Sequence, residues 1–231
     1  MTLLIEQLKI ELAEAGARIE AARVRGGFEQ TVRLLAATKY VARDDMEMLR
    51  AAGIKLVGEN RADELEEKWR VYGDAFEFHF IGHLQRRKVR QVIPCAALIH
   101  SVESLSLVQQ IDARAEAAVD VLLEVNVSGE TTKYGILPAD AEAFLERAAP
   151  YKAVRFVGLM TMAPFVRDAD DVRPVFRRLR ELRDDLAPRF ASRYPLTELS
   201  MGMSNDYEVA VEEGATLVRL GSTLFSRAQG G

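Results

Sequence analysis

Eight short apolar segments recur along this chain of 231 residues, and segments with helical spacing separate them. Each apolar segment is nearly continuous rather than alternating, which is typical of parallel strands that are covered on both faces. The candidate strands are residues 33–39, 55–60, 76–82, 97–102, 120–127, 154–162, 198–202 and 217–222. Eight strand–helix repeats predict an α/β chain folded as a (β/α)8 TIM barrel.

The segment before the first repeat, residues 1–26, carries apolar residues at helical spacing along one face, so we expect an extra N-terminal helix. The repeats fill residues 33–226, and no linker interrupts them. We therefore expect a single domain over residues 1–231. The alternative is an open doubly wound sheet, which the sequence favours less because no Gly-x-Gly-x-x-Gly follows the first strand.

Composition excludes several classes of protein. The net charge of -4 gives no overall positive field for nucleic acid or an anionic membrane. No segment has the roughly 20 consecutive apolar residues that a membrane span requires, and a single cysteine, Cys95, suits a buried thiol in the reducing cytoplasm. The three histidines, His79, His83 and His100, lie at different strand ends without a cysteine or paired carboxylates, so we expect no metal site.

Polar and small residues gather where the predicted strands end. The first four ends carry Lys39, Asn60, His79 and His100, and similar residues follow the later strands. The strand beginnings carry nothing comparable. Because the carboxyl ends of barrel strands meet at one mouth, this pattern predicts one functional site there.

The seventh and eighth strand ends, SMGMSND and RLGST, are rich in glycine and hydroxyl residues. Phosphate groups are often held after these two strands of a TIM barrel, by backbone amides and a helix N-terminus. Either segment alone could be an ordinary turn of small residues. The two together favour a phosphate site.

Two cationic side chains accompany the predicted phosphate site. Arg219 lies two residues before Gly221 on the same side of its strand, and a buried guanidinium must meet an acceptor, either a glutamate or a heterocyclic nitrogen. Lys39 ends the apolar run LLAATK and is either the solvated edge of the sheet or an amine for Schiff-base chemistry. Lysine, arginine and a phosphate grip together suit a phosphorylated aldehyde.

These motifs resemble the pyridoxal phosphate homeostasis proteins, short single-domain relatives of the alanine racemase barrel. The resemblance extends along nearly the whole chain. The matching stretches are LLAATKYV, VGENRADELEEK, FHFIGHLQRRKVR, IHSVESL, VNVSGETTKYGI, VGLMTM and LSMGMSNDYEVAVEEGATLVRLGSTLF.

The resemblance implies pyridoxal 5′-phosphate (PLP) as the cofactor, with Lys39 holding it as an internal aldimine. It implies that Arg219 faces the pyridine nitrogen and that Asn60 and His79 line the cofactor. The implied phosphate grip and its neighbours are Ser200, Met201, Ser204, Gly221, Ser222 and Thr223.

The chain departs from the family pattern at two places. Arg87 stands before Lys88 where the family often has asparagine, within a basic run at residues 86–90. This run is a solvated helix face, a secondary anion site or a contact for recipient enzymes. Tyr134 replaces a frequent serine, and we interpret this as a surface variation.

The resemblance implies a non-catalytic role in which the chain buffers PLP and delivers it to recipient PLP enzymes, with indirect effects on amino- and keto-acid balance. An arginine opposite the pyridine nitrogen leaves the ring a poorer electron sink, and the second domain that supplies a base in racemases is missing. We therefore expect no catalytic residue and a cytoplasmic monomer. A PLP-dependent amino-acid racemase, another weak PLP enzyme and a Schiff-base aldolase are the alternatives.

Overall fold

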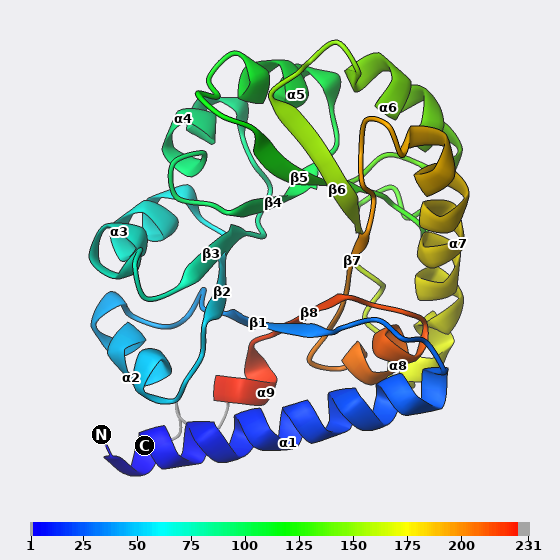
Figure 1. The fold of residues 1–231 in the computed structure, drawn as a ribbon. Helices are drawn as coiled ribbons and strands as arrows, with labels where there is room; N and C mark the ends of the chain where they lie inside the picture. Colours follow the sequence, from blue (N-terminus) through cyan, green and yellow to red (C-terminus); the bar gives the residue numbers. More distant parts are fainter. Residues whose placement is uncertain (1, 226–231) are drawn as a thin grey trace.

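The computed structural model describes residues 2–225 and contains a closed barrel of eight parallel strands in sequence order (Figure 1). The predicted (β/α)8 TIM barrel is therefore confirmed, although the expected barrel boundary at residue 226 lies outside the described residues. The strands are β1 (Arg33–Ala37), β2 (Leu56–Glu59), β3 (Glu77–Phe80), β4 (Leu98–Val102), β5 (Val119–Glu124), β6 (Val154–Met160), β7 (Glu198–Met203) and β8 (Leu217–Leu220).

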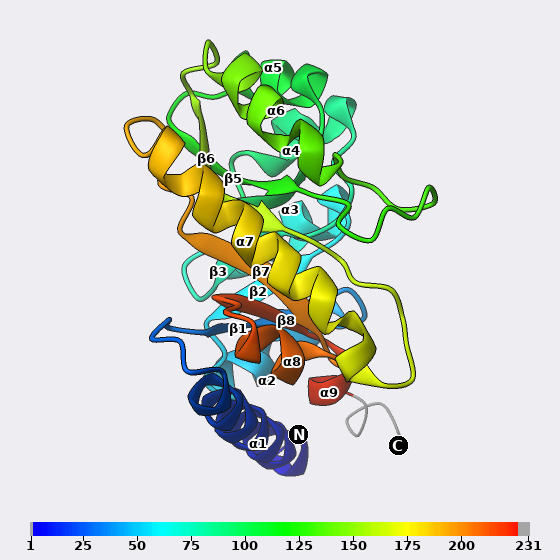
Figure 2. The ribbon, with the colours of Figure 1, turned by 90° about the vertical axis from the view of Figure 1, so that its right-hand side faces the viewer.

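Helices surround the barrel, and the long α7 crosses its outer face (Figure 2). The α-helices are α1 (Thr2–Gly26), α2 (Met46–Ala51), α3 (Ala62–Tyr72), α4 (Val89–Val92), α5 (Leu105–Asp112), α6 (Ala141–Ala148), α7 (Arg173–Phe190), α8 (Tyr207–Glu212) and α9 (Ser222–Phe225). Four short 3-10 turns precede helices: η1 (Arg43–Asp45), η2 (Arg86–Lys88), η3 (Pro138–Asp140) and η4 (Ala169–Val172).

The extra helix α1 packs beside α8, α9 and α2 at one side of the barrel (Figure 1). Its buried face includes Leu8, Ala15, Ile19 and Ala22, which follow the helical spacing of the sequence. Gly26 lets the end of this helix approach α8 closely, because a Cβ there would lie 2.5 Å from the carbonyl oxygen of Glu212. The N-terminal helix thus covers the outside of the barrel where its first and last repeats meet.

Two apolar layers result from the alternation of side chains along each strand. The smaller layer fills the barrel interior and consists of Leu35, Leu56, Leu98, Leu122, Val157, Met160 and Leu217. The larger layer lies between the barrel and its helices and includes Ala36, Phe78 and Phe80. His79 lies between Phe78 and Phe80 on β3. Because both phenylalanines face outward, His79 points into the barrel.

The strand β7 departs from regular pairing just before the mouth. Its register against β8 shifts between Ser200 and Met203, which is a β-bulge or irregularity. Gly202 has a φ of 89°, and a Cβ there would lie 2.6 Å from the Cβ of Ala210. Bulges often redirect a chain next to functional sites, and this one turns the following residues toward the cavity described below.

Two further expectations concern membrane spans and the single cysteine. Within residues 2–225, no helix is long and apolar enough to cross a membrane. Cys95 is buried, and desolvation raises the pKa of its thiol to about 11. This cysteine therefore has the character of a packing residue.

Candidate functional site

A cavity of about 860 Å³ opens where the strands end at their carboxyl termini. Residues at or after the ends of all eight strands contribute to its wall: Ala37, Lys39, Asn60, Ile81, Ser101, Glu124, Met160, Ser204, Arg219 and Gly221 are among them. This is the mouth at which TIM barrels carry their sites. The volume lies within the range that holds a small-molecule cofactor.

The backbone that carries Lys39 is held by a buried polar cluster. The hydroxyl of Thr38 donates to Oε1 of Glu59 at 2.5 Å. The ammonium group of Lys68 donates to the same carboxylate oxygen at 2.6 Å and to the carbonyl oxygen of Thr38 at 2.9 Å. Because Thr38, Glu59 and Lys68 are all fully buried, the point at which β1 ends is fixed.

The side chain of Lys39 is exposed to the cavity rather than tied down. Its Nζ lies 4.8 Å from the centroid of the Tyr40 ring. Within residues 2–225 it makes no hydrogen bond or ion pair, so its amine is available to a ligand.

Arg219 contributes a buried guanidinium to the cavity wall, with only 6% of the residue exposed. Its Nη1 donates to Oγ of Ser200 at 2.5 Å, and its Nη2 donates to the carbonyl oxygen of Thr161 at 3.0 Å. Burial lowers the pKa of this guanidinium to about 10. Both protein acceptors are neutral. Because a guanidinium has five N–H groups, those not used in these two contacts can donate to an acceptor on a ligand.

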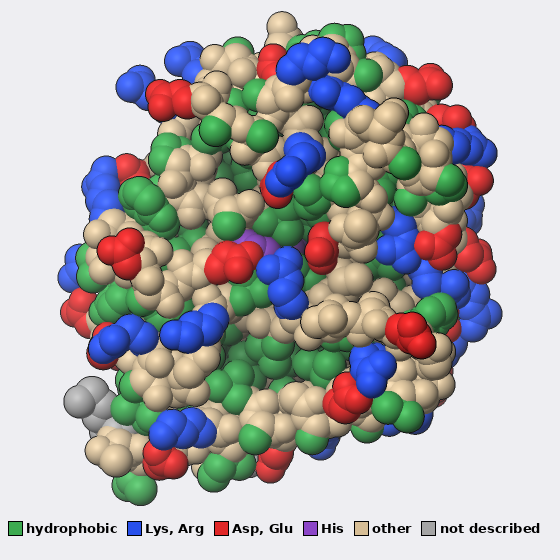
Figure 3. Space-filling model, in the orientation of Figure 1, with side chains coloured by type: hydrophobic (Ala, Val, Ile, Leu, Met, Phe, Trp, Pro, Cys, Tyr) green, Lys and Arg blue, Asp and Glu red, His purple; other side chains and the backbone are tan. Residues whose placement is uncertain are grey.

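A chain of hydrogen bonds connects Arg219 to the floor of the barrel. Oγ of Ser200 lies 3.0 Å from Nδ1 of His100, and Nε2 of His100 lies 3.0 Å from Nδ1 of His79. Nε2 of His79 lies 2.8 Å from Oε1 of Glu77 at the start of β3. In Figure 3 a histidine is visible at the centre of the barrel between acidic and basic side chains.

The direction of this chain follows from the charge state of its histidines. Burial lowers the pKa of both rings, most strongly that of His100, so each is neutral and carries one N–H. Arg219 donates to Ser200, and Ser200 donates to Nδ1 of His100. Nε2 of His100 then donates to His79, whose Nε2 donates to the carboxylate. Every member is satisfied, and Arg219 is held in one orientation.

The loops after β7 and β8 meet at Ser204, and this meeting point is called the cradle below. Oγ of Ser204 accepts from the backbone N–H of Gly221 at 3.3 Å and from that of Thr223 at 3.2 Å. The side chain of Asp206 closes the β7 turn by accepting from the N–H of Met203 at 2.6 Å. A Cβ on Gly221 would meet only Ala37, at 3.6 Å. Both amides are engaged by Ser204, so a phosphate group would accept from them in place of the Ser204 hydroxyl oxygen.

Comparison with known proteins agrees with this geometry. The family model of the alanine racemase N-terminal domain matches residues 19–228. A pyridoxal phosphate homeostasis protein of Aquifex aeolicus is 43% identical over 213 residues, which cover 90% of this chain and 92% of that protein. The chain belongs to the pyridoxal phosphate homeostasis protein family.

Other members of this family match at similar length. The protein of that name from Pseudomonas aeruginosa is 37% identical, with 93% of each chain covered. The structure of PipY from Synechococcus elongatus, solved with PLP bound, superposes with a TM-score of 0.79 at 31% identity. That comparison covers 94% of this chain and 99% of PipY.

The structure brings six of the ten residues that the family resemblance implied to the cavity wall. They are Lys39, Asn60, Ser204, Arg219, Gly221 and Ser222. Asn60 approaches Gly82 closely, because a Cβ on Gly82 would lie 2.1 Å from the carbonyl oxygen of Asn60. These residues come from β1, β2, β7 and β8, which adjoin one another through the closure of the barrel.

The other four residues are not among those that line the cavity, and their contact with the cofactor stays a prediction. His79 and Ser200 are completely buried and take part in the hydrogen-bond chain beneath Arg219. Met201 alternates with Ser200 along β7 and therefore points into the layer between strand and helices. Thr223 faces Ser204 through its backbone N–H and its hydroxyl.

Two polar residues of the wall were missed by the reasoning from sequence. Glu124 at the end of β5 is buried, and desolvation raises the pKa of its carboxyl to about 7. Ser101 at the end of β4 has a buried hydroxyl with no hydrogen-bond partner among the described residues. The strand-end position of both residues was the available signal.

Tyr134 lies at the surface, as expected, with 57% of the residue exposed. It also lines the cavity and stacks on His83 with ring centroids 4.3 Å apart. Glu103 joins the two segments, since it pairs with His83 at 3.3 Å and accepts from the N–H of Gly135 at 2.5 Å. The loop after β5 therefore leans over the cavity entrance.

The cavity offers no metal-binding cluster among residues 2–225, where no three His, Cys, Asp or Glu side chains could hold an ion together. The polar groups of the wall are instead one amine, one guanidinium, the imidazole of His83, hydroxyls, amides and two buried carboxyl groups, Glu124 and Asp206. This set suits an anionic organic ligand with a carbonyl group.

Proposed function

We propose that this chain binds PLP reversibly in the barrel-mouth cavity and acts as a non-catalytic carrier in PLP homeostasis. The observation that carries the proposal is the meeting of Lys39, Arg219 and the glycine- and serine-rich loops of the cradle in one cavity. PLP is the ligand bound by PipY, a relative that shares almost the full length of the chain.

The residues fit the three functional groups of PLP. The loops after β7 and β8, with Ser204, Gly221 and Ser222 on the wall, would hold the phosphate. The guanidinium of Arg219 would donate to the ring nitrogen, because its protein acceptors leave N–H groups unused. When bound, the cofactor supplies an aldehyde that an amine captures reversibly, and Lys39 supplies the free amine.

The residues behind the wall would position these contacts. Ser200 fixes the guanidinium of Arg219, and His79 terminates the chain that holds Ser200 in place. Thr223 shapes the cradle through Ser204, and Met201 anchors β7 in the outer apolar layer. None of the four needs to touch the cofactor to affect its binding.

The non-catalytic part of the proposal rests on Arg219. A guanidinium opposite the ring nitrogen stabilises an unprotonated ring, which is a poor electron sink. One observation favours the second candidate, a weak PLP enzyme: Glu124 lines the cavity with a pKa of about 7, which suits proton transfer at neutral pH. The name of the relatives describes PLP homeostasis and no reaction, and an experiment decides between the two candidates.

Two measurements test these proposals. Adding PLP to the purified chain is expected to give a visible absorption band that Lys39→Ala lacks; a chain that gives no band overturns the binding proposal. Exchange of amino-acid α-protons in deuterated water is then measured with the loaded protein. The carrier proposal expects a background rate in both the wild type and Glu124→Gln. Robust exchange that Glu124→Gln abolishes would replace it with the enzyme proposal.

Delivery to recipient PLP enzymes, a monomeric state and a cytoplasmic location remain predictions. Transfer of PLP from the loaded chain to a cofactor-free PLP enzyme, faster than dissociation into buffer, would support direct delivery. Light scattering of the purified chain would give the oligomeric state.

A further inference from the structure

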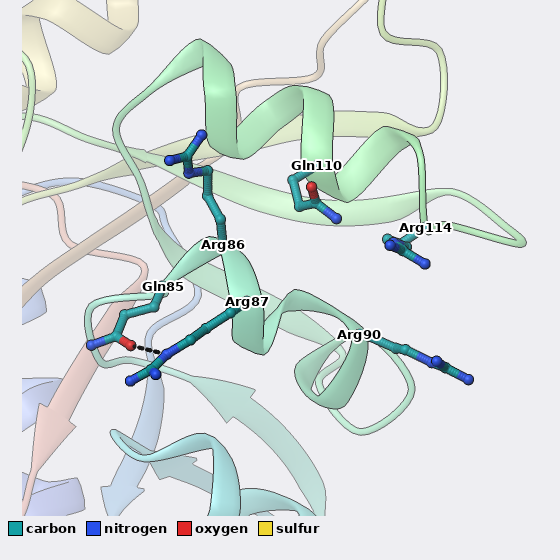
Figure 4. A pocket seen from close by; sticks show the side chains of 6 residues that line it. All are labelled: Gln85, Arg86, Arg87, Arg90, Gln110 and Arg114. Atoms are coloured by element: carbon teal, nitrogen blue, oxygen red, sulfur yellow. Dashed lines mark hydrogen bonds between the residues drawn. The ribbon is translucent and has the colours of Figure 1, made fainter.

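A second hollow, of about 550 Å³, lies outside the barrel mouth and is lined entirely by basic and amide side chains. They come from the η2–α4 segment and from the region of α5 that faces it (Figure 4). The lining residues are Gln85, Arg86, Arg87, Arg90, Gln110 and Arg114. We refer to this feature as the arginine hollow.

The positive charge of the arginine hollow is not compensated by the protein. Among residues 2–225, none of its four arginines forms an ion pair; Arg87 donates only to the amide oxygen of Gln85, at 2.9 Å. Lys88, in the same basic run, is instead paired with Asp63 at 2.6 Å. The chain as a whole carries a net charge of -4, so four unpaired guanidinium groups in one hollow are a local feature.

The arginines stand on a rigid base. Val89 and Val92 of the α4 side are completely buried, and so are Val108 and Ile111 of α5. These residues fix the distance between the two elements. The backbone positions of Arg86 and Arg114 are therefore fixed, whereas the exposed side chains of the four arginines extend in different directions (Figure 4).

We propose that the arginine hollow is a second binding site, specific for small molecules that carry a diphosphate group. A guanidinium presents its N–H groups in a planar fork that matches phosphate oxygens, and several such groups balance the charge of a diphosphate. The lining contains no aromatic residue and no aliphatic residue, so the anion itself is recognised rather than an attached base or ring.

This site is separate from the PLP cavity but connected to it by a short segment. Gly82 and His83 line the cavity, and Gln85, two residues later, lines the arginine hollow. The proposal does not depend on PLP binding, because the two sites share no lining residue.

The test is calorimetric titration of pyrophosphate into the PLP-saturated protein at constant ionic strength. Saturation keeps pyrophosphate out of the phosphate cradle. We expect pyrophosphate to bind at least about tenfold more tightly than sulfate, because several guanidinium forks engage it together. Titrations of ADP and of inorganic phosphate distinguish a nucleoside diphosphate or free diphosphate from a single phosphate group.

Charge-reversal variants locate the binding. Arg86→Glu and Arg114→Glu are each expected to weaken pyrophosphate binding by about tenfold or more. The control Arg147→Glu reverses an exposed, unpaired arginine elsewhere, on α6, and is expected to change the affinity by less than about twofold. The PLP absorption band is expected to persist in all three variants, which separates this test from that of the cofactor proposal.

Three outcomes would overturn the proposal. One is pyrophosphate binding no tighter than sulfate binding. Another is an equal loss of affinity in Arg147→Glu and in the variants of the hollow. The third is tighter binding of hexaglutamate than of pyrophosphate, which would assign the arginine hollow to an acidic peptide instead.

Discussion

Two lysines, Lys39 and Lys68, lie near the end of β1, and they differ in exposure and in contacts. Lys39 continues the strand and points its amine into the cavity, beside the Tyr40 ring. Lys68 comes from α3 and is completely buried, and its ammonium group contacts Glu59 and the carbonyl oxygen of Thr38. One lysine faces a space large enough for a cofactor, whereas the other holds the backbone beneath it.

The difference shows which features make a lysine of this fold available to react with a ligand and which give it a structural role. Lys68 is held by two acceptors in the protein interior, so no ligand reaches its amine. Lys39 has no protein acceptor among residues 2–225, and its immobile neighbour Thr38 sets where its side chain begins. A rigid backbone with a free amine is the arrangement that a reversible covalent site requires.

The largest expected effect comes from removing the structural lysine. Lys68→Met leaves the carboxylate of Glu59 buried without a charged partner, and we expect a loss of about 3–5 kcal/mol in the free energy of unfolding. Urea denaturation measures the loss. Lys88→Met, which breaks the exposed pair with Asp63, is the matched control and should change stability little. Equal effects in the two variants would contradict the structural role of Lys68.

Glu124 is a buried carboxyl group whose side chain has no hydrogen bond or ion pair among residues 2–225, in contrast to the paired carboxylate of Glu59. Burial raises the pKa of Glu124 from its ordinary value of 4.5 to about 7, so the folded state favours the protonated carboxyl. Relative to Glu124→Gln, the free energy of unfolding of the wild type should therefore fall as the pH rises from about 4.5 to about 7, by up to about 3 kcal/mol. Above that range the difference should be constant. Parallel pH profiles for the two proteins would show that the carboxyl is not shifted.

Access of PLP to Lys39 is expected to depend on the stacked rings of Tyr134 and His83 at the cavity entrance. Tyr134→Ser removes the ring that stacks on His83, so PLP should bind and leave about threefold to fivefold faster with a smaller change in affinity. Stopped-flow absorbance measures both rates. Leu137→Ser, in the same loop but outside the cavity lining, serves as the control. Unchanged rates in Tyr134→Ser would show that the loop does not gate the cavity.

The smallest expected effect concerns the ring beside the free amine. Tyr40→Ala removes a cation–π contact that is worth about 0.5–1 kcal/mol at an exposed site, so the affinity for PLP should change by less than about fivefold. Tyr40→Phe keeps a ring and should match the wild type in an absorbance titration. A loss of binding in Tyr40→Phe would assign a role to the hydroxyl instead.

The fold was predictable because parallel strands covered on both faces leave a strong apolar signal. All eight segments form strands, although β1 ends at Ala37, two residues before the predicted end at residue 39. Asn60 and Gly221 directly follow strand ends and Lys39 comes two residues after one, and all three line the cavity at the expected mouth of the barrel. The family resemblance supplied their expected roles.

Side-chain direction was the part that sequence reasoning did not resolve. The family resemblance places Met201 next to Ser200 at the phosphate grip, but consecutive residues of a strand face opposite sides, so the Met201 side chain packs in the outer apolar layer. His79 faces inward but is completely buried in the hydrogen-bond chain and is not among the residues that line the cavity. The arginine hollow combines a basic run with Arg114 of a later segment, a combination that only the packing of α4 beside α5 creates.

The most direct test of the cofactor proposal is to identify which lysine PLP reaches. The purified chain is incubated with PLP, reduced with borohydride, digested and mapped by mass spectrometry. We predict that the pyridoxyl label falls on Lys39 and that Lys39→Ala incorporates none, while Lys68 stays unlabelled in both proteins. A label on Lys68 or on Lys133, or full incorporation into Lys39→Ala, would contradict the assignment of Lys39.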